Sequence, residues 1–117
     1  MELTIYHNPQ CSKSRNTLSL IKEQGIKPEI ILYLENIISA KDIRNIAKLL
    51  HFPIKDIIRN NNKDYMKEKN YPVGEKDIEL SIWLAKNPEA LQRPIVVNNS
   101  NGKAIIGRPP ENLYEIL

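Results

Sequence analysis

The sequence predicts an α/β fold: one domain spanning 1–117, with a mixed sheet built in the order β-α-β, helical insertion, β-β-α. Three observations support this prediction. The chain has 117 residues, which suits one domain with a sizeable core. Helical periodicity fills the segment at about 39–88. Short β-prone runs lie on both sides of that segment, at 3–7, 29–34, 94–97 and 103–106.

The first elements predict a parallel pair of strands. The run "LTIYH" (3–7) is a strand that an asparagine-proline turn ends. Ser12 or Ser14 caps the following helix, and Gly25 suits the position just after its end. The run "EIILYL" (29–34) is typical of a buried strand. This order predicts two parallel strands joined by a crossover helix.

The middle of the chain predicts the helical insertion. Ser39 and Asp42 resemble a capping box at the start of a helix. A short helix is expected at 54–59, a solvated loop at 60–70 and another helix at 76–86. The apolar residues at helical spacing in the first helix are Ile43, Ile46, Ala47 and Leu50. Those expected on one face of the last helix are Ile78, Ile82 and Ala85.

The last elements predict a hairpin and a terminal helix. The strands 94–97 and 103–106 flank the polar turn "NNSNG", and the segment 109–117 begins a helix with proline in its first turn. An N-terminal strand that runs into a cysteine-bearing loop, with this element order after it, is typical of a thioredoxin-like sheet.

Composition bounds the class of protein. No basic leader followed by an apolar stretch opens the chain, and no segment has the apolar length that a bilayer requires, so we expect a cytoplasmic protein with no membrane partner. The net charge is +3 and the sequence pI is about 9.0, which permits an anionic ligand. The lysines are scattered, so a nucleic-acid partner is not expected.

Cys11 is the only cysteine, and it stands at the start of a predicted helix. Helix N-termini and nearby cations favour the thiolate, and Lys13 and Arg15 supply positive charge. A lone cysteine is usually a small buried hydrophobe, but the polar neighbours Gln10 and Ser12 are unlike a core position. The loop "CSKSR" therefore predicts a nucleophile beside an oxyanion site. With one thiol, any redox reaction requires a second thiol from outside.

The two histidines give weaker signals. His7 either tunes the thiolate or caps the end of the first strand, and the sequence leaves both interpretations open. His51 is expected to serve packing or the surface. It has no metal-ligand spacing with Cys11, so no metal is predicted.

Three arginines stand in apolar or proline-bounded settings: Arg59, Arg93 and Arg108. Any one of them alone is more often a solvated edge residue. Guanidinium groups bind tetrahedral oxyanions through two hydrogen bonds and stay charged, so together with Cys11 they predict an anion clamp. The isomer of the bond before Pro94 is not readable from sequence.

The segments "YHNPQCSKSRNTLSLIKEQG", "ILYLE", "QRPIVV" and "IIGRPPENLYEIL" resemble the glutaredoxin-coupled ArsC-type arsenate reductases along nearly the whole chain. The "CSKS" loop is similar to that of chromosomal members. The resemblance implies that Cys11 is the nucleophile that bonds to arsenic and that His7 tunes its thiolate. It also implies anion-binding and catalytic roles for Arg59, Arg93 and Arg108, and an oxyanion pocket formed with Ser14 and Arg15.

The resemblance further implies arsenate reduction with glutathione as co-substrate, glutaredoxin as partner and no bound cofactor. Two alternatives stay open. One is a regulator similar to the Spx-type proteins that bind RNA polymerase, although those often carry a second cysteine where this chain has Ser14 and typically lack "GRPPE". The other is a glutathione-dependent thiol reductase without arsenic specificity.

Overall fold

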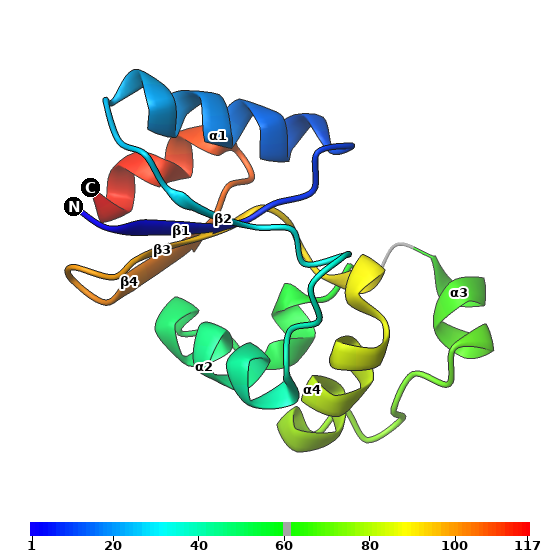
Figure 1. The fold of residues 1–117 in the computed structure, drawn as a ribbon. Coiled ribbons are helices and arrows are strands. Elements are labelled where there is room, and N and C mark those ends of the chain that lie inside the picture. The colour runs from blue at the N-terminus through cyan, green and yellow to red at the C-terminus, as the bar shows by residue number, and fades with distance from the viewer. Residues whose placement is uncertain (60–61) are drawn as a thin grey trace. The chain divides into compact units, whose positions relative to one another are not determined.

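The computed structural model describes residues 1–59 and 62–117, and these form two compact units (Figure 1). The first unit contains Met1–Asn36 and Arg93–Leu117, and the second contains Ile37–Gln92. The expected helical insertion at about 39–88 falls inside the second unit. That the whole chain is one domain stays a prediction.

The first unit is built on a four-stranded mixed sheet, as predicted. Its strands are β1 (Leu3–Tyr6), β2 (Glu29–Ile31), β3 (Ile95–Asn98) and β4 (Lys103–Ile106), in the spatial order β2-β1-β3-β4. β1 pairs with β2 in parallel, and β3 pairs antiparallel with both β1 and β4. The parallel pair confirms the crossover connection between the first two strands.

The crossover helix is α1 (Ser12–Glu23), and both of its ends are well defined. Its N-cap residue is Cys11, so the expectation of a serine cap at 12 or 14 is wrong. Gly25 follows the helix with φ 74°, and its N–H bonds to the carbonyl of Lys22. The predicted end of the helix is therefore confirmed, because only glycine adopts this conformation without steric cost.

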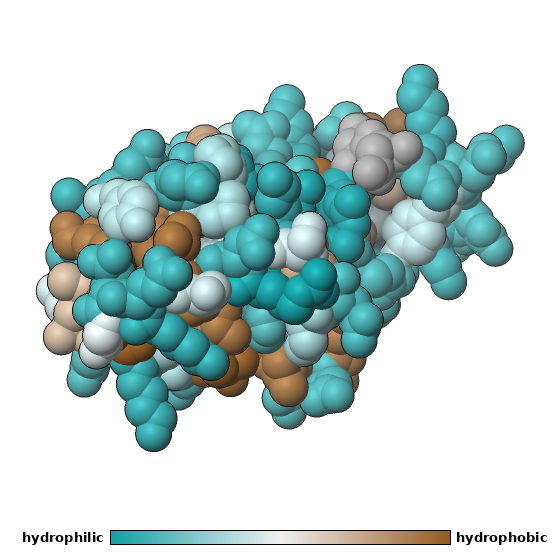
Figure 2. All heavy atoms as spheres, turned by 90° about the horizontal axis from the view of Figure 1, so that it is seen from above, coloured by the Kyte–Doolittle hydropathy of each residue, from teal (hydrophilic) through white to brown (hydrophobic). Residues whose placement is uncertain are grey.

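One face of the sheet packs against α1 and the 3₁₀ helix η3 (Pro110–Ile116), which lie side by side in Figure 1. The terminal helix predicted at 109–117 is thus helical, with 3₁₀ geometry. Over α1 the surface is mainly hydrophilic (Figure 2). The core beneath these helices consists of Leu3, Ile5, Ile21, Val96, Ile105, Leu113 and Ile116.

The second strand is shorter and more exposed than the sequence suggested. β2 ends at Ile31, and the side chain of Ile30 is 44% exposed. The predicted strand is therefore confirmed at Glu29–Ile31, but its burial and its extension to residue 34 are wrong. β2 lies at the edge of the sheet, so it has a neighbouring strand on one side only, and the chain turns at Leu32, whose carbonyl accepts from the N–H of Glu35.

The second unit is helical. It contains α2 (Ala40–Leu50), the 3₁₀ helix η1 (Ile54–Ile57), α3 (Lys63–Glu68), α4 (Asp77–Lys86) and the 3₁₀ helix η2 (Pro88–Ala90). Ser39 caps α2 by accepting from the N–H of Asp42, as predicted. The four apolar residues predicted for α2 are all buried, and α2 packs against α4.

The short helix expected at 54–59 ends earlier than predicted. η1 stops at Ile57, and Ile58 then pairs with Leu91 in an isolated antiparallel bridge. The N–H of Gln92 bonds to the carbonyl of Ile57, and the N–H of Arg59 bonds to the carbonyl of Ala90. These long-range backbone bonds replace the helical ones, and sequence periodicity gives no sign of them.

The expected solvated loop at 60–70 is wrong for most of its length. Residues 60 and 61 lie outside the described part of the chain. From Lys63 the chain forms α3, because Asn62 accepts from the N–H of Tyr65 and caps the helix. Met66 is buried, and Trp83 donates its indole N–H to the carbonyl of Lys69. One apolar residue and one cap therefore suffice to form a short helix in a polar stretch.

The predicted inner face of α4 is also wrong. Ile78 and Ile82 are 65% and 45% exposed, whereas Trp83 and Leu84 are 6% and 1% exposed. The helix carries two apolar stripes, and the stripe with tryptophan is the one that packs. A large aromatic side chain buries more apolar area than an isoleucine, which explains this choice.

Candidate active site

Cys11 lies at the junction between a compact loop and α1. The Cys11 N–H bonds to the carbonyl of Asn8 at 3.0 Å, and the Cys11 carbonyl accepts from the N–H of Arg15 at 3.0 Å. The Asn8 side chain also accepts from the N–H of Gln10 at 3.0 Å. The thiol is partly exposed and forms no disulfide. The first turn of α1 carries no acidic residue, so nothing there offsets the positive end of the helix dipole.

Buried groups beneath the loop hold it in place. The Ser14 hydroxyl oxygen lies 2.7 Å from His7 Nδ1 and accepts from the N–H of Asn8 at 3.0 Å. The backbone N–H of His7 bonds to the carbonyl of Ile31 in β2 at 2.8 Å, and this bond connects the start of the loop to the sheet. Ser14 is 0% exposed and His7 is 6% exposed. The Ser14 hydroxyl is therefore engaged with the loop itself, and its predicted contact with substrate stays a prediction.

The surroundings of His7 favour its neutral form. Burial lowers the pKa of His7 below 6.5, and the positive charges of Lys22 and Arg15 lower it further. A neutral imidazole adds no positive charge beside the thiol. The contacts of His7 are with Ser14 and Ile31, and its predicted role in tuning the thiolate stays a prediction.

Two of the three predicted arginines lie beside Cys11. Arg108 follows β4, and its Nη1 lies 3.8 Å from Cys11 Sγ and 3.2 Å from the carbonyl oxygen of Arg93. Arg93 lies two residues before β3, and its side chain also interacts with the Cys11 thiol. The peptide bonds after both arginines are cis. The loop after β1 and the segments around β3 and β4 thus meet at one end of the sheet.

These neighbours lower the pKa of Cys11 from 9.0. Burial raises this pKa and is the largest single influence. The backbone N–H groups of Ser14 and Lys13 and the guanidinium of Arg93 lower it, and together they outweigh burial. The same helix N-terminus favours a second negative charge beside the thiolate, such as that of a bound anion.

Arg15 braces the same loop from its outer side. Its Nη1 donates to the carbonyl of Pro9 at 2.8 Å, and the side chain is exposed. One edge of the guanidinium is therefore committed to the loop. Its predicted contact with an oxyanion stays a prediction.

Arg59 and His51 lie in the second unit. Arg59 directly follows the bridge at Ile58, and its part in the clamp stays a prediction. His51 is exposed and ends α2 in the left-handed conformation with φ 60°, which agrees with a surface position.

The sequence did not reveal Asn8 as an organising residue of the site. Its carbonyl, N–H and side-chain oxygen each make a hydrogen bond within the loop. The available signal is the asparagine placed before a proline, because asparagine side chains bond to the backbone two residues later in tight turns. That pattern predicts a turn, and the contact with Ser14 becomes visible only in the fold.

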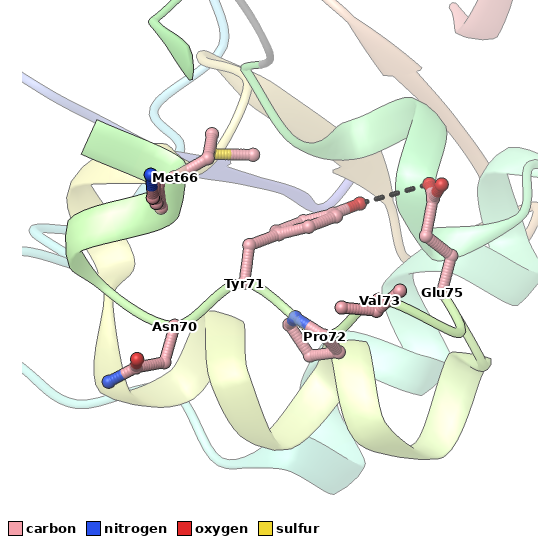
Figure 3. Close-up of a pocket in the computed structure, with 7 residues that line it drawn as sticks. Met66, Asn70, Tyr71, Pro72, Val73 and Glu75 are labelled. Carbon is pink, nitrogen blue, oxygen red and sulfur yellow. Dashed lines mark hydrogen bonds between the residues drawn. The ribbon is translucent and has the colours of Figure 1, made fainter. Parts of the chain in front are cut away.

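The second unit carries a separate pocket of about 540 Å³. Figure 3 shows that it lies between the end of α3 and the segment before α4, and that Tyr71 donates a hydrogen bond to Glu75 there. None of the residues predicted for catalysis or binding lines this pocket. Its lining residues are Met66, Lys67, Asn70, Tyr71, Pro72, Val73 and Glu75.

Across 1–59 and 62–117, no three His, Cys, Asp or Glu side chains gather closely enough to hold a metal ion. Over the same residues, every helix is too short or too polar to cross a bilayer.

A mixed sheet with a thiol at the N-terminus of its crossover helix is typical of the thioredoxin-like class of proteins. The model of the ArsC family matches residues 6–116, and the chain belongs to this family. The chain is 44% identical to the Escherichia coli protein YfgD over 99% of its own length and 97% of that protein. It is 39% identical to an arsenate reductase of Haemophilus influenzae, with both chains covered over 100% of their length.

A solved structure shows the same fold. The structure of an arsenate reductase from Vibrio cholerae has a TM-score of 0.90 and 39% sequence identity to this chain. The likeness covers 100% of this chain and 98% of the other. The predicted α/β class and mixed sheet are therefore confirmed.

Proposed function

We propose that this protein is an arsenate reductase that uses Cys11 as its nucleophile. The observation that carries the proposal is the contact of Cys11 Sγ with Arg108 Nη1 at 3.8 Å, at the N-terminus of α1. This arrangement joins a thiol of lowered pKa to donors that bind a tetrahedral oxyanion. Two relatives named as arsenate reductases, matched over 100% and 98% of their lengths, support the same substrate.

Arsenate binds, in this proposal, between the first turn of α1 and the arginines. The N–H groups of Lys13 and Ser14 bind one oxygen, and the guanidinium groups of Arg93 and Arg108 bind the others. Arg59 is proposed as a third cation, on its resemblance to the family pattern alone. Arg15 and the His7–Ser14 pair hold the loop that presents Cys11.

In the first step the Cys11 thiolate attacks arsenic. A sulfur–arsenic bond forms, and a protonated arsenate oxygen leaves as water. The arginines neutralise the oxyanion as charge moves onto the departing oxygen. Arsenic stays in its pentavalent state through this step.

In the second step an external thiol reduces the adduct. Glutathione attacks the Cys11 sulfur, a disulfide forms between the two, and the electron pair of the broken sulfur–arsenic bond stays on arsenic, which leaves as trivalent arsenite. A glutaredoxin thiol then attacks the glutathione sulfur of this disulfide and releases Cys11 as a thiolate. The second thiol must be external because Cys11 is the only cysteine of the chain. A cytoplasmic location is proposed on the same ground, since that compartment supplies reduced thiols.

The test is arsenate reduction by the purified protein with glutathione and glutaredoxin. The parent is expected to form arsenite, and Cys11→Ser is expected to be inactive because a hydroxyl is a much weaker nucleophile. Ser12→Ala, at the exposed neighbouring position, is the matched control and keeps the activity of the parent. Absence of arsenite formation by the parent overturns the proposal. If the parent then reduces mixed disulfides of glutathione, it is a thiol reductase, and if it instead binds RNA polymerase, it is a regulator.

A further inference from the structure

Gly107 lies where three segments of the site meet. It separates β4 from Arg108, and its N–H bonds to the carbonyl of Pro94 at 2.8 Å. Its carbonyl oxygen lies 3.4 Å from the Thr17 hydroxyl on α1, the helix that begins after Cys11. One residue without a side chain therefore contacts the neighbour of Arg93, precedes Arg108 and lies against the helix that carries the thiol.

No room exists for a side chain at position 107. A Cβ placed on Gly107 would lie 2.5 Å from Thr17 Oγ1, 3.1 Å from Thr17 Cγ2 and 2.8 Å from Pro94 Cγ. Thr17 is 0% exposed, and its hydroxyl also donates to the carbonyl of Lys13 at 2.8 Å. The obstructing atoms thus belong to a stiff, buried β-branched side chain and to a proline ring, which yield little.

The glycine is required here by packing. The glycines with positive φ are Gly25 and Gly102, and Gly107 is not one of them. Alanine is therefore compatible with the backbone of Gly107, and its only cost is the space that a methyl group occupies.

The other side of the segment is also held. Asn112 Nδ2 donates to the carbonyl of Ile106 at 3.0 Å and to that of Arg108 at 3.3 Å. Asn112 on one side and Thr17 on the other therefore both hold the backbone at 106–108 in its position. The 3.8 Å separation between Arg108 Nη1 and Cys11 Sγ depends on that position.

We propose that Gly107 is a positioning residue, whose close approach to Thr17 and Pro94 sets the distance from the Arg108 guanidinium to Cys11. The proposal deepens the proposed function, since it assigns the alignment of a clamping arginine to a residue that has no side chain to offer the thiol or the anion. A methyl group at position 107 displaces the backbone away from α1 and withdraws the guanidinium from the sulfur.

The test compares Gly107→Ala with the parent by two measurements. We expect kcat/KM for arsenate to fall by at least about tenfold, since a misplacement on the order of 1 Å costs up to about 100-fold. We also expect the inflection in the rate of Cys11 alkylation by iodoacetamide to move to higher pH, because a nearby guanidinium favours the thiolate. Adding Thr17→Ala removes two of the three obstructing atoms and should restore part of both losses.

Gly74→Ala is the matched control. A Cβ at Gly74 meets only Glu79 Oε2, at 3.9 Å, and the position has no positive φ. This variant should keep the kcat/KM and the alkylation inflection of the parent. If Gly107→Ala behaves like Gly74→Ala, or lowers only the Tm, the residue serves packing alone and the proposal is wrong.

A double-variant cycle tests whether Gly107 acts through Arg108. In the Arg108→Ala background, Gly107→Ala should leave the alkylation inflection unchanged. If Gly107→Ala shifts the alkylation inflection as far in the Arg108→Ala background as in the parent, the proposal is overturned. If Gly107→Ala does not fold, the double variant Gly107→Ala/Thr17→Ala is compared with Thr17→Ala. The clash of the new methyl group with Pro94 remains in the double variant, so its alkylation inflection should still lie at higher pH than that of Thr17→Ala. Equal inflections in these two variants count against the proposal.

Alkylation needs no arsenate, so the two proposals fail separately. A parent that reduces no arsenate removes the proposed function, and the alkylation cycle still decides the role of Gly107. A parent that reduces arsenate, with no effect of Gly107→Ala on either measurement, removes only the positioning role.

Discussion

His7 Nδ1 and the Ser14 hydroxyl oxygen lie 2.7 Å apart beneath the cysteine loop, so the two side chains form a buried hydrogen bond. The Ser14 oxygen also accepts from the backbone N–H of Asn8. A neutral imidazole carries one ring proton, so the tautomer of His7 sets which of the two side chains donates. The histidine therefore joins the end of β1 to the first turn of α1.

Removing the Ser14 hydroxyl should destabilise the protein. Ser14→Ala leaves His7 Nδ1 and the Asn8 N–H buried without this partner, at a cost of about 1–3 kcal/mol. Urea unfolding of the variant measures this loss. Ser12→Ala, at an exposed position one residue into α1, is the control and should cost far less. Equal effects of the two substitutions would contradict the arrangement.

The neutral state of His7 predicts how stability depends on pH. Burial and the charges of Lys22 and Arg15 lower the pKa of His7 in the folded state, so the unfolded chain takes up a proton on it at higher pH than the folded protein. The free energy of unfolding therefore falls as pH falls below 6.5, and the contribution is complete above that value. Urea unfolding at several pH values should show that the free energy of unfolding changes less with pH in His7→Gln than in the parent.

The Cys11 thiol should lose its proton at a lower pH than a free thiol does. The N–H groups of Ser14 and Lys13 and the Arg93 guanidinium outweigh burial and lower the pKa of Cys11. The rate of iodoacetamide alkylation should therefore inflect below pH 9.0 in the folded protein. Unfolding in urea should move the inflection up to that of a free thiol. An inflection that is the same in both states would remove the electrostatic basis of the proposed chemistry.

The elements that local chemistry determines were predictable from sequence. The glycine at 25 and the serine at 39 mark the ends of their helices, because a positive φ and a capping hydroxyl depend on few neighbours. The place of Cys11 between a turn and a helix was also predictable, since it is the N-cap residue of α1, and its reactivity stays a prediction.

What depends on distant partners was not predictable. The burial of Trp83 in place of Ile82 on α4 depends on which stripe the rest of the helical unit covers. The contact of Arg108 with Cys11 joins residues at opposite ends of the chain, and the steric role of Gly107 depends on Thr17 and Pro94. Periodicity describes one element at a time, so it carries no information on these contacts.

The observed inner face of α4 leads to a contrast between two apolar residues. Leu84 is 1% exposed and Ile82 is 45% exposed. Leu84→Ala should cost about 2–5 kcal/mol of unfolding free energy, because it leaves a cavity. Ile82→Ala should change stability by only about 0.5 kcal/mol. Urea unfolding of both variants measures the difference. A larger loss of stability in Ile82→Ala than in Leu84→Ala would instead support the inner face that periodicity predicts.

The arginine clamp gives the sharpest prediction about catalysis. Arg93→Lys and Arg108→Lys keep the positive charge but lose the planar fork that binds two oxygens of one anion. Each should lower kcat/KM for arsenate by roughly 100-fold, the scale seen when one donor to a developing oxyanion is removed. The Tm should change little for Arg108→Lys, because that side chain is exposed. Arg44→Lys is the matched control, since Arg44 bonds to Ser81 within the helical unit and has no proposed part in the reaction.

Arg59→Lys decides whether the third cation belongs to the clamp. A fall in kcat/KM like that of Arg93→Lys includes Arg59 in the clamp, and a kcat/KM like that of Arg44→Lys excludes it. Activity equal to the parent in both Arg93→Lys and Arg108→Lys would show that charge alone suffices, and the bidentate clamp would then be wrong even with Cys11 essential.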